Sequence, residues 1–224
     1  MAVVADESGE LTRMRRTTQS SAAWAGVVIL GTISFWNTAT AARPQTQGSP
    51  VAASEITLGI NAAKSTVHYS VESTVHTVHG TFAVKEGSAV HFDPATGKAG
   101  GEVAVYATSG DSGNNSRDQR MNKEILETQK YPDFVFRPKQ IDGTVVREGA
   151  CDLKLHGVMQ IHGSEHDVTA DVHAELSGGQ WKGLAKFDVP YIQWGIKDPS
   201  NWLLKVKPTV HVEVDVAGTQ KSNL

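Results

Sequence analysis

The sequence predicts an all-β fold, an antiparallel barrel of about eight strands with one short helix near the barrel mouth. From Ile56 onward, apolar side chains alternate with polar ones far more often than they recur at helical spacing. Turn sequences such as Asp142-Gly143 and Gly178-Gly179 separate the alternating segments. Strands with one apolar face must bury that face, and closure into a barrel does so while removing exposed strand edges.

The alternation divides the strand residues into an outward polar set and an inward apolar set. The inward set comprises Val67, Tyr69, Val71, Val78, Gly80, Phe82, Val84, Val103, Val105, Ala107, Phe134, Phe136, Cys151, Leu153, Leu155, Gly157, Met159, Ile161, Val168, Ala170, Val172, Ala174, Leu176, Trp181, Ala185, Phe187, Val189, Val210, Val212, Val214 and Val216. A barrel of this size has room for a tight side-chain core or for one ligand, and both remain open at this point. A two-sheet sandwich is the alternative fold, because alternation alone does not distinguish it from a barrel.

The N-terminal region has the three parts of a secretory signal peptide. Arginines precede an uncharged, mostly apolar run over residues 22–36, and Ala39-Thr40-Ala41 then supplies the small residues that a signal peptidase needs. At about 1.5 Å per residue the run is shorter than a hydrocarbon core of roughly 30 Å. An uncleaved membrane anchor is therefore the less favoured alternative.

These features set the expected domain boundaries. Residues 1–41 are expected to be removed, and the protein is expected to be periplasmic or secreted. Acidic residues ahead of Met14 fit an export signal poorly, so a translation start at Met14 remains open. Residues 42–54 predict a flexible spacer, residues 55–217 the barrel and residues 218–224 a tail.

One segment departs from the alternation and predicts a short helix. Ser116 and Gln119 have the spacing of a capping box, in which two side chains satisfy the first free helical amides. Met121, Ile125 and Leu126 then form a narrow apolar stripe, and Tyr131-Pro132 is expected to stop the helix. We expect this helix to pack over one mouth of the barrel.

The nine histidines resemble a metal-binding set, and the strand parity tests that interpretation. An outward position is predicted for His68, His79, His91, His156, His162, His173 and His211. His166 is expected in or beside a turn. His76 alone shares the parity of Val78 and Phe82, so it is the one histidine predicted to face the barrel interior. A metal site is therefore not expected.

The chemistry-bearing motifs of common enzymes do not occur in the sequence. It contains no Gly-x-Ser-x-Gly elbow, no phosphate loop and no dinucleotide fingerprint. Cys151, the one cysteine, has inward parity, where a thiol stays protonated and unreactive. The net charge of −3 gives no reason to expect nucleic acid as a partner. We therefore predict a protein that is not an enzyme and carries no cofactor.

Several short segments in a fixed order resemble the YceI-like family, exported bacterial proteins with a lipocalin-like barrel that bind polyisoprenoids or related amphiphilic chains. Their order and spacing cover nearly the whole chain from about residue 55 to residue 217, although no single segment is decisive. The matching segments are Val78-His79-Gly80-Thr81-Phe82, Phe92-Asp93-Pro94, Asn115-Ser116-Arg117-Asp118 with Met121, Lys130-Tyr131-Pro132-Asp133-Phe134-Val135-Phe136, Leu153-Lys154-Leu155-His156-Gly157 with Met159 and Ile161, and Trp194-Gly195-Ile196.

The resemblance implies that the barrel interior holds a lipid, with no metal and no catalytic residues. The partner would be a polyisoprenoid, a quinone tail or another long-chain lipid, held for transport, storage or a stress response. An inward set of mostly Val, Leu, Ala and Phe suits such a chain better than a sugar or a phosphate. The residues expected to line the lumen and contact this ligand are Tyr69, Val71, His76, Phe82, Val103, Val105, Phe134, Phe136, Leu155, Phe187 and Trp194.

Three other interpretations stay open. The inward side chains could simply fill the barrel. The outward histidines could make the chain an exported interaction protein or a pH-responsive one, since imidazole titrates near pH 6.5. A metal-dependent hydrolase is the third, less favoured interpretation, because few polar groups are predicted to converge inside. Transient contact with a membrane and a homodimer are open as well.

The first prediction concerns processing of the chain. The small residues at Ala39-Thr40-Ala41 place the cleavage site so that the mature protein begins near Ala42. N-terminal sequencing of protein recovered from outside the cytoplasm checks this. Retention of residues 1–41 in a membrane fraction would contradict the prediction.

Overall fold

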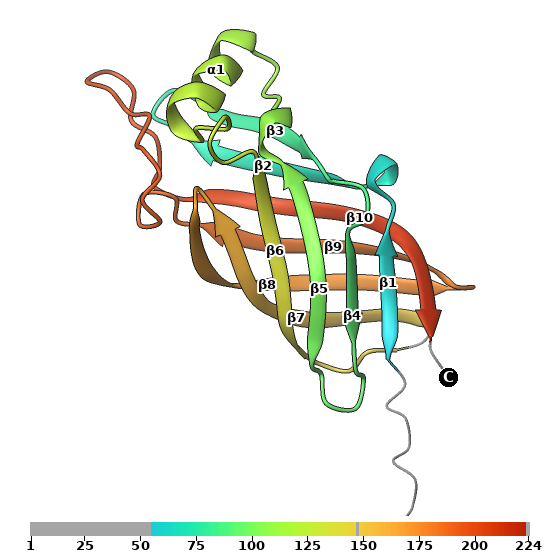
Figure 1. The fold of residues 1–224 in the computed structure, drawn as a ribbon. Coiled ribbons are helices and arrows are strands. Elements are labelled where there is room, and N and C mark those ends of the chain that lie inside the picture. The colour runs from blue at the N-terminus through green and yellow to red at the C-terminus, as the bar shows by residue number, and fades with distance from the viewer. Residues whose placement is uncertain (1–54, 147, 223–224) are drawn as a thin grey trace, which may run out of the picture. The chain divides into compact units, whose positions relative to one another are not determined.

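The computed structural model describes residues 55–146 and 148–222, and the predicted signal peptide, the Met14 start and the spacer lie outside them. The described chain forms ten strands: β1 (Ile56–Ile60), β2 (Thr66–Glu72), β3 (Thr77–Ala83), β4 (Ala89–Phe92), β5 (Ala99–Tyr106), β6 (Asp133–Asp142), β7 (Gly149–Ile161), β8 (Ser164–Ser177), β9 (Gln180–Val189) and β10 (Val210–Ser222). All strand pairs are antiparallel, which confirms the predicted all-β class (Figure 1).

Eight of these strands close into a barrel. Hydrogen-bonded neighbours run β1, β4, β5, β6, β7, β8, β9 and β10, and β10 then returns to β1. The long strand β10 pairs with β9 along one edge and with two strands along the other, where residues 218–222 pair with β1 and residues 211–215 pair with β2. The β2–β3 hairpin therefore extends the barrel wall from β10. The predicted barrel is confirmed, and the sandwich alternative is wrong.

The C-terminal boundary differs from the prediction. Residues 218–222 belong to β10 and pair along the whole of β1, from Ile60 opposite Gly218 to Ile56 opposite Ser222. The alternation of apolar residues ends near Ala217, so the sequence pattern indicated a tail from residue 218. The strand continues because its backbone groups find partners in β1, which does not require apolar side chains.

The inward set predicted from alternation lies inside the barrel. One large cluster of buried residues joins side chains from all around the wall, including Val67, Phe82, Ala174 and Val212. A smaller cluster of Ile56, Phe92 and Ile141 packs near the end of the barrel at which the β4–β5 connection lies. The interior faces thus follow the two-residue period of the strands.

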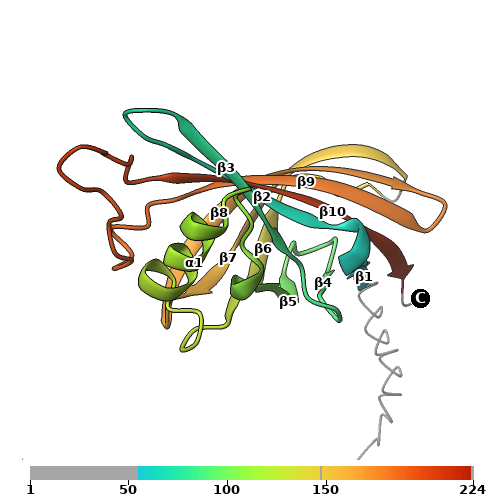
Figure 2. The same cartoon turned by 90° about the horizontal axis from the view of Figure 1, so that it is seen from above.

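The one α-helix of the described residues, α1 (Asn115–Arg120), lies at the end of the barrel where the β2–β3 turn is found (Figure 2). It continues as a π-helical turn, η3 (Met121–Ile125), in which the Leu126 amide donates to the Met121 carbonyl at 2.9 Å. The chain then turns at Glu127, whose φ is 47°. The helix ends there, several residues before the predicted stop at Tyr131-Pro132.

The predicted capping box is wrong. Asn114 is the N-cap, and its side-chain oxygen accepts from the Arg117 amide at 3.0 Å. Asn and Ser are both good N-cap residues, so the local pattern did not distinguish them. Asp118 instead bonds Ser112, whose amide donates to Asp118 Oδ1 at 3.1 Å.

The second prediction tests barrel closure through two glycines on facing strands. A Cβ on Gly218 would lie 1.8 Å from the Gly59 carbonyl oxygen, whereas a Cβ on Gly59 would make only ordinary contacts, 3.5 Å from Thr219 Oγ1. We expect Gly218→Ala to lower the free energy of unfolding by at least about 2 kcal/mol and Gly59→Ala by less than about 1 kcal/mol. Urea unfolding of both variants measures this. Equal stabilities would show that the β1–β10 contact does not limit closure.

Candidate functional site

The barrel encloses a cavity of about 460 Å³. This volume falls within the range of about 300–1,000 Å³ that is usual for ligand pockets. Its wall comes from the inward faces of the strands, from α1 and η3, and from the long loop between β9 and β10. The inward side chains therefore do not fill the barrel, which contradicts the interpretation that they form only a packed core.

The wall within the barrel is apolar. Phe134 and Phe136 on β6 and Phe187 on β9 face the interior and line the cavity, yet stay only half-buried. Aromatic rings cluster on one side, where the centroids of Tyr69 and Phe82 lie 5.2 Å apart and those of Phe82 and Phe134 lie 5.4 Å apart. Such a surface favours apolar ligand atoms.

Charged and polar groups reach the cavity from the end at which α1 lies. Arg117 and Arg120 come from α1, and Ser73 and His76 come from the β2–β3 turn. Arg117 is held in place, because its Nε donates to Ser112 Oγ at 2.7 Å and its Nη2 to the Ser112 carbonyl at 2.6 Å. The cavity wall is therefore apolar along its length, and these four polar residues border it at one end.

Tyr69 lies between the aromatic wall and the helix. Its hydroxyl donates to Met121 Sδ at 3.7 Å. Burial raises the pKa of the Tyr69 phenol, and the negative charge of Asp118 raises it further. The ring passes over Gly80, where an added Cβ would lie 2.5 Å from ring atoms. Gly80 thus supplies the space that Tyr69 occupies.

Tyr191 begins the β9–β10 loop and also lines the cavity. The residue is buried, and its hydroxyl has no hydrogen-bond partner within the part of the chain that the structure describes. Burial raises the pKa of Tyr191 to about 12, with a further contribution from Asp198. A buried hydroxyl without a hydrogen-bond partner lowers the stability of the fold, because its desolvation is not compensated.

The structure brings ten of the eleven predicted lumen residues to one cavity. They are Tyr69, Val71, His76, Phe82, Val103, Val105, Phe134, Phe136, Leu155 and Phe187. Their contact with a ligand remains a prediction. His76 lies in the turn just before β3 and so reaches the cavity from its mouth.

Trp194 is the exception, because it does not line the cavity. Its ring stacks on His166, with centroids 4.3 Å apart and ring planes 3° apart. His166 belongs to β8 and has the inward parity of Val168, so His76 is not the one inward histidine. The prediction missed this because β8 begins at Ser164, directly after the turn, where parity could not be assigned from sequence.

Cavity residues outside the strands were also missed. Arg117, Arg120, Pro199, Leu204 and Val206 all line the cavity. The strand period does not apply to the helix or to the β9–β10 loop. No sequence signal indicated that this loop folds back over the barrel mouth.

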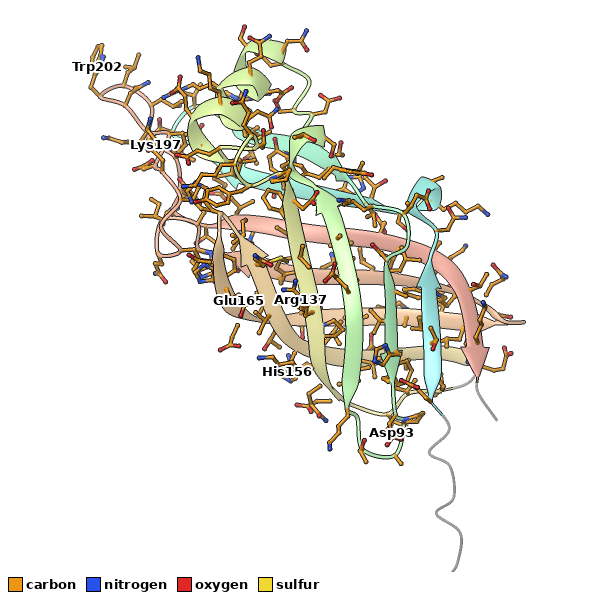
Figure 3. All side chains as sticks on the ribbon, in the orientation of Figure 1. Asp93, Arg137, His156, Glu165, Lys197 and Trp202 are labelled. Carbon is orange, nitrogen blue, oxygen red and sulfur yellow. The ribbon has the colours of Figure 1, made fainter. Side chains whose placement is uncertain are left out.

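The outward histidines form separate pairs with carboxylates. His68 Nε2 lies 3.4 Å from Asp215, and His211 Nδ1 lies 2.6 Å from Asp188. His156 and His173 likewise contact Asp142 and Asp152; Figure 3 shows His156 on the outer surface, below Arg137 and Glu165. Hydrogen bonding to Asp152 raises the pKa of His173.

His162 departs from its predicted position. It lies in the β7–β8 turn with a φ of 51°, and its ring packs on Tyr131 with centroids 4.6 Å apart. Within residues 55–146 and 148–222, no three His, Cys, Asp or Glu side chains gather in a way that could hold a metal ion. In the same residues, no helix is long and apolar enough to cross a membrane.

The fold and cavity can now be compared with known proteins. The family model of the YceI-like domain matches residues 59–218. The chain belongs to the YceI-like family. No curated protein matches the chain by sequence. The predicted resemblance is therefore confirmed for most of the barrel.

Solved structures show the same fold as this YceI-like chain. The Burkholderia cenocepacia protein BcnA has 18% identity and a TM-score of 0.58, over 71% of this chain and 99% of that one. A polyisoprenoid binding domain from Saccharophagus degradans has 12% identity and a TM-score of 0.55, over 73% and 98%. A Campylobacter jejuni YCEI protein has 18% identity and a TM-score of 0.54, over 64% and 85%. At these identities the likeness concerns the fold alone.

The third prediction uses the unpartnered hydroxyl of Tyr191. We expect Tyr191→Phe to leave stability at neutral pH unchanged or higher, because the variant removes a buried donor without a partner. The matched variant Tyr69→Phe loses the bond to Met121 and should cost up to about 1 kcal/mol. Thermal unfolding at neutral pH compares the two. A loss of more than about 2 kcal/mol for Tyr191→Phe would contradict the assignment.

The same variant gives a pH dependence. The folded pKa of Tyr191, about 12, lies above the ordinary value of 10.0, so its neutral form contributes stability below pH 10 that is lost between pH 10 and about 12. The free energy of unfolding of Tyr191→Phe should therefore fall less steeply over this range than that of the parent chain. Parallel curves would show that the phenol is not buried.

Proposed function

We propose that this YceI-like protein binds a long apolar or amphiphilic chain, such as a polyisoprenoid or quinone tail, in its barrel. The observation that carries the proposal is the polarity of the cavity, which is apolar within the strands and carries Arg117, Arg120, Ser73 and His76 at one end. The tail would lie among the phenylalanines, and the polar end of the molecule would lie beside α1. A compact polar ligand would leave its groups unpaired in the barrel.

The energetics favour a chain-like ligand. Each methylene transferred from water to an apolar site contributes about 0.8 kcal/mol, so ten buried carbons contribute roughly 8 kcal/mol. Association costs an estimated 4–15 kcal/mol, which such a chain can offset with no charged contact inside the barrel. The Arg117 and Arg120 side chains would add contacts only at the mouth.

The solved relatives support the same class of ligand. The Saccharophagus degradans structure is described as a polyisoprenoid binding domain, and its fold covers 73% of this chain. The predicted signal peptide supports a role outside the cytoplasm, in transport, storage or a stress response. Binding, not catalysis, is the activity that the polarity of this cavity favours.

The fourth prediction compares one substitution at two alanines of opposite parity. Ala185 on β9 lines the cavity, whereas Ala104 on β5 has outward parity. Ala185→Leu should displace part of the bound chain and weaken binding of a polyprenyl probe, geranylgeraniol, by about tenfold or more, since two displaced methylenes are worth roughly 1.6 kcal/mol. Ala104→Leu should leave binding unchanged.

Two measurements check this prediction. Mass spectrometry of organic extracts gives the amount and length of lipid that copurifies with each folded variant, and titration of delipidated protein gives the affinity for geranylgeraniol. Thermal unfolding controls for global damage. The proposal fails if the parent chain carries no lipid and does not bind the probe, or if both variants bind it as the parent does.

A further inference from the structure

Exposed apolar side chains gather around the polar end of the cavity. Of five large apolar side chains that are exposed in the described part of the chain, four come from the β2–β3 turn and the β9–β10 loop: Val75, Ile192, Trp202 and Leu203. Trp202 is 90% exposed and Leu203 71%. The fifth, Tyr106, lies on β5. The Lys85 Nζ lies over the Tyr106 ring, 4.8 Å from the ring centroid. Apolar groups this exposed are usually functional when they cluster.

The turn and the loop form one surface. The Thr74 amide donates to the Lys205 carbonyl at 2.9 Å, and the Lys207 amide donates to the Glu72 carbonyl at 2.8 Å. Ser73 and Val206 pair as an isolated bridge between these bonds. Backbone contacts therefore hold residues 72–74 of the turn against residues 205–207 of the loop, next to Val75 and the loop tip.

The loop tip is built to present Trp202 and Leu203. The Asn201 side-chain oxygen accepts from the Leu203 amide at 2.9 Å and from the Leu204 amide at 2.7 Å. This turn directs Leu204 to the cavity, while Trp202 stands at the outer tip, away from the barrel (Figure 3). The same short segment thus contacts the cavity on one side and is open on the other.

The surroundings of this tip are basic. The three segments at the mouth, residues 72–77, 115–126 and 190–209, contain six basic residues and four acidic ones, in a chain whose net charge is −3. Lys197, Lys205 and Lys207 flank the tip along the loop. Lys197 lies 3.9 Å from Glu124 and Lys207 lies 4.0 Å from Glu72, and both pairs are exposed. Figure 3 shows Lys197 on the same loop as Trp202. Positive charge beside exposed Trp and Leu complements an anionic lipid surface.

We propose that the Trp202–Leu203 tip docks this protein on an anionic lipid bilayer, with the polar end of the cavity facing the membrane. Tryptophan prefers the membrane interface because its ring is apolar and its N–H is polar, and the lysines contact the head groups. A second protein copy fits less well, since a stable interface buries about 800 Å² on each partner and this patch consists of a few side chains at two loop tips. Docking goes beyond the proposed function and requires no bound cargo.

The fifth prediction follows an environment-sensitive label at the tip. Leu203→Cys in the protein that begins at Ala42, without the apolar run over residues 22–36, is labelled with nitrobenzoxadiazole and mixed with phosphatidylcholine vesicles containing about 30% phosphatidylglycerol. Cys151 is buried, and the unsubstituted chain serves as the labelling blank. We expect a blue shift and at least a twofold rise in emission on these vesicles, little change on pure phosphatidylcholine, and little change for a label at Tyr106→Cys.

Variants separate the apolar and the ionic contributions. Trp202→Ser with Val75→Ser, and separately Lys205→Gln with Lys207→Gln, should each weaken vesicle binding of the labelled chain by about fivefold or more. Lys154→Gln with Lys186→Gln, on the barrel wall, is the matched charge control and should change binding little. Salt should weaken binding of the parent chain.

Three outcomes would overturn the proposal. They are an unchanged tip label on anionic vesicles, binding that the tip variants do not weaken, and a concentration-dependent shift of the label without vesicles, which would indicate a second copy as the occupant. Geranylgeraniol binding is measured on the same variants. Loss of docking with probe binding intact, or the reverse, distinguishes this proposal from the proposed function.

Discussion

The pairing of β10 with both β1 and β2 is the contact on which the rest of the structure depends. It returns the sheet to its first strand and so encloses an interior, with β3 left at the end of the sheet. Closure requires a close backbone approach at Gly218 beside Gly59, and the Trp181 indole N–H donates to the Gly59 carbonyl at 3.1 Å. A cavity follows because the inward side chains, mostly Val and Ala with a few aromatic rings, are too small together to fill the enclosed space.

The alternation of side chains between the two faces of each strand also explains why the residues lining the cavity could be predicted. Each strand places alternate residues inside, so counting along β5, β6 or β9 from sequence assigns the wall without knowledge of the partners. Phe134, Phe136 and Phe187 were found in this way.

The sequence did not predict the features of the turns, the helix and the loops, because apolar residues do not alternate regularly there. Trp194 and His166 stack on each other at the start of β8 and beyond β9, where a turn or loop decides which face a side chain takes. The N-cap at Asn114 and the continuation of β10 beyond Ala217 depend on backbone partners, which leave no apolar pattern. The cavity contacts of Arg117 and Val206 arise from tertiary folding of α1 and the β9–β10 loop over the mouth.

This division between wall and mouth has a functional consequence. The wall is a rigid, hydrogen-bonded barrel, whereas the mouth is assembled from a turn, a short helix and a loop that are joined by few backbone bonds. Under the proposed function, specificity for an apolar chain would belong to the wall, and access to the cavity would belong to the mouth. Because Leu204 and Val206 line the cavity within four residues of the exposed Trp202, any displacement of the loop tip changes the cavity entrance as well. If both proposals hold, entry of a ligand and contact of the tip with a membrane would be coupled through this one short segment of chain.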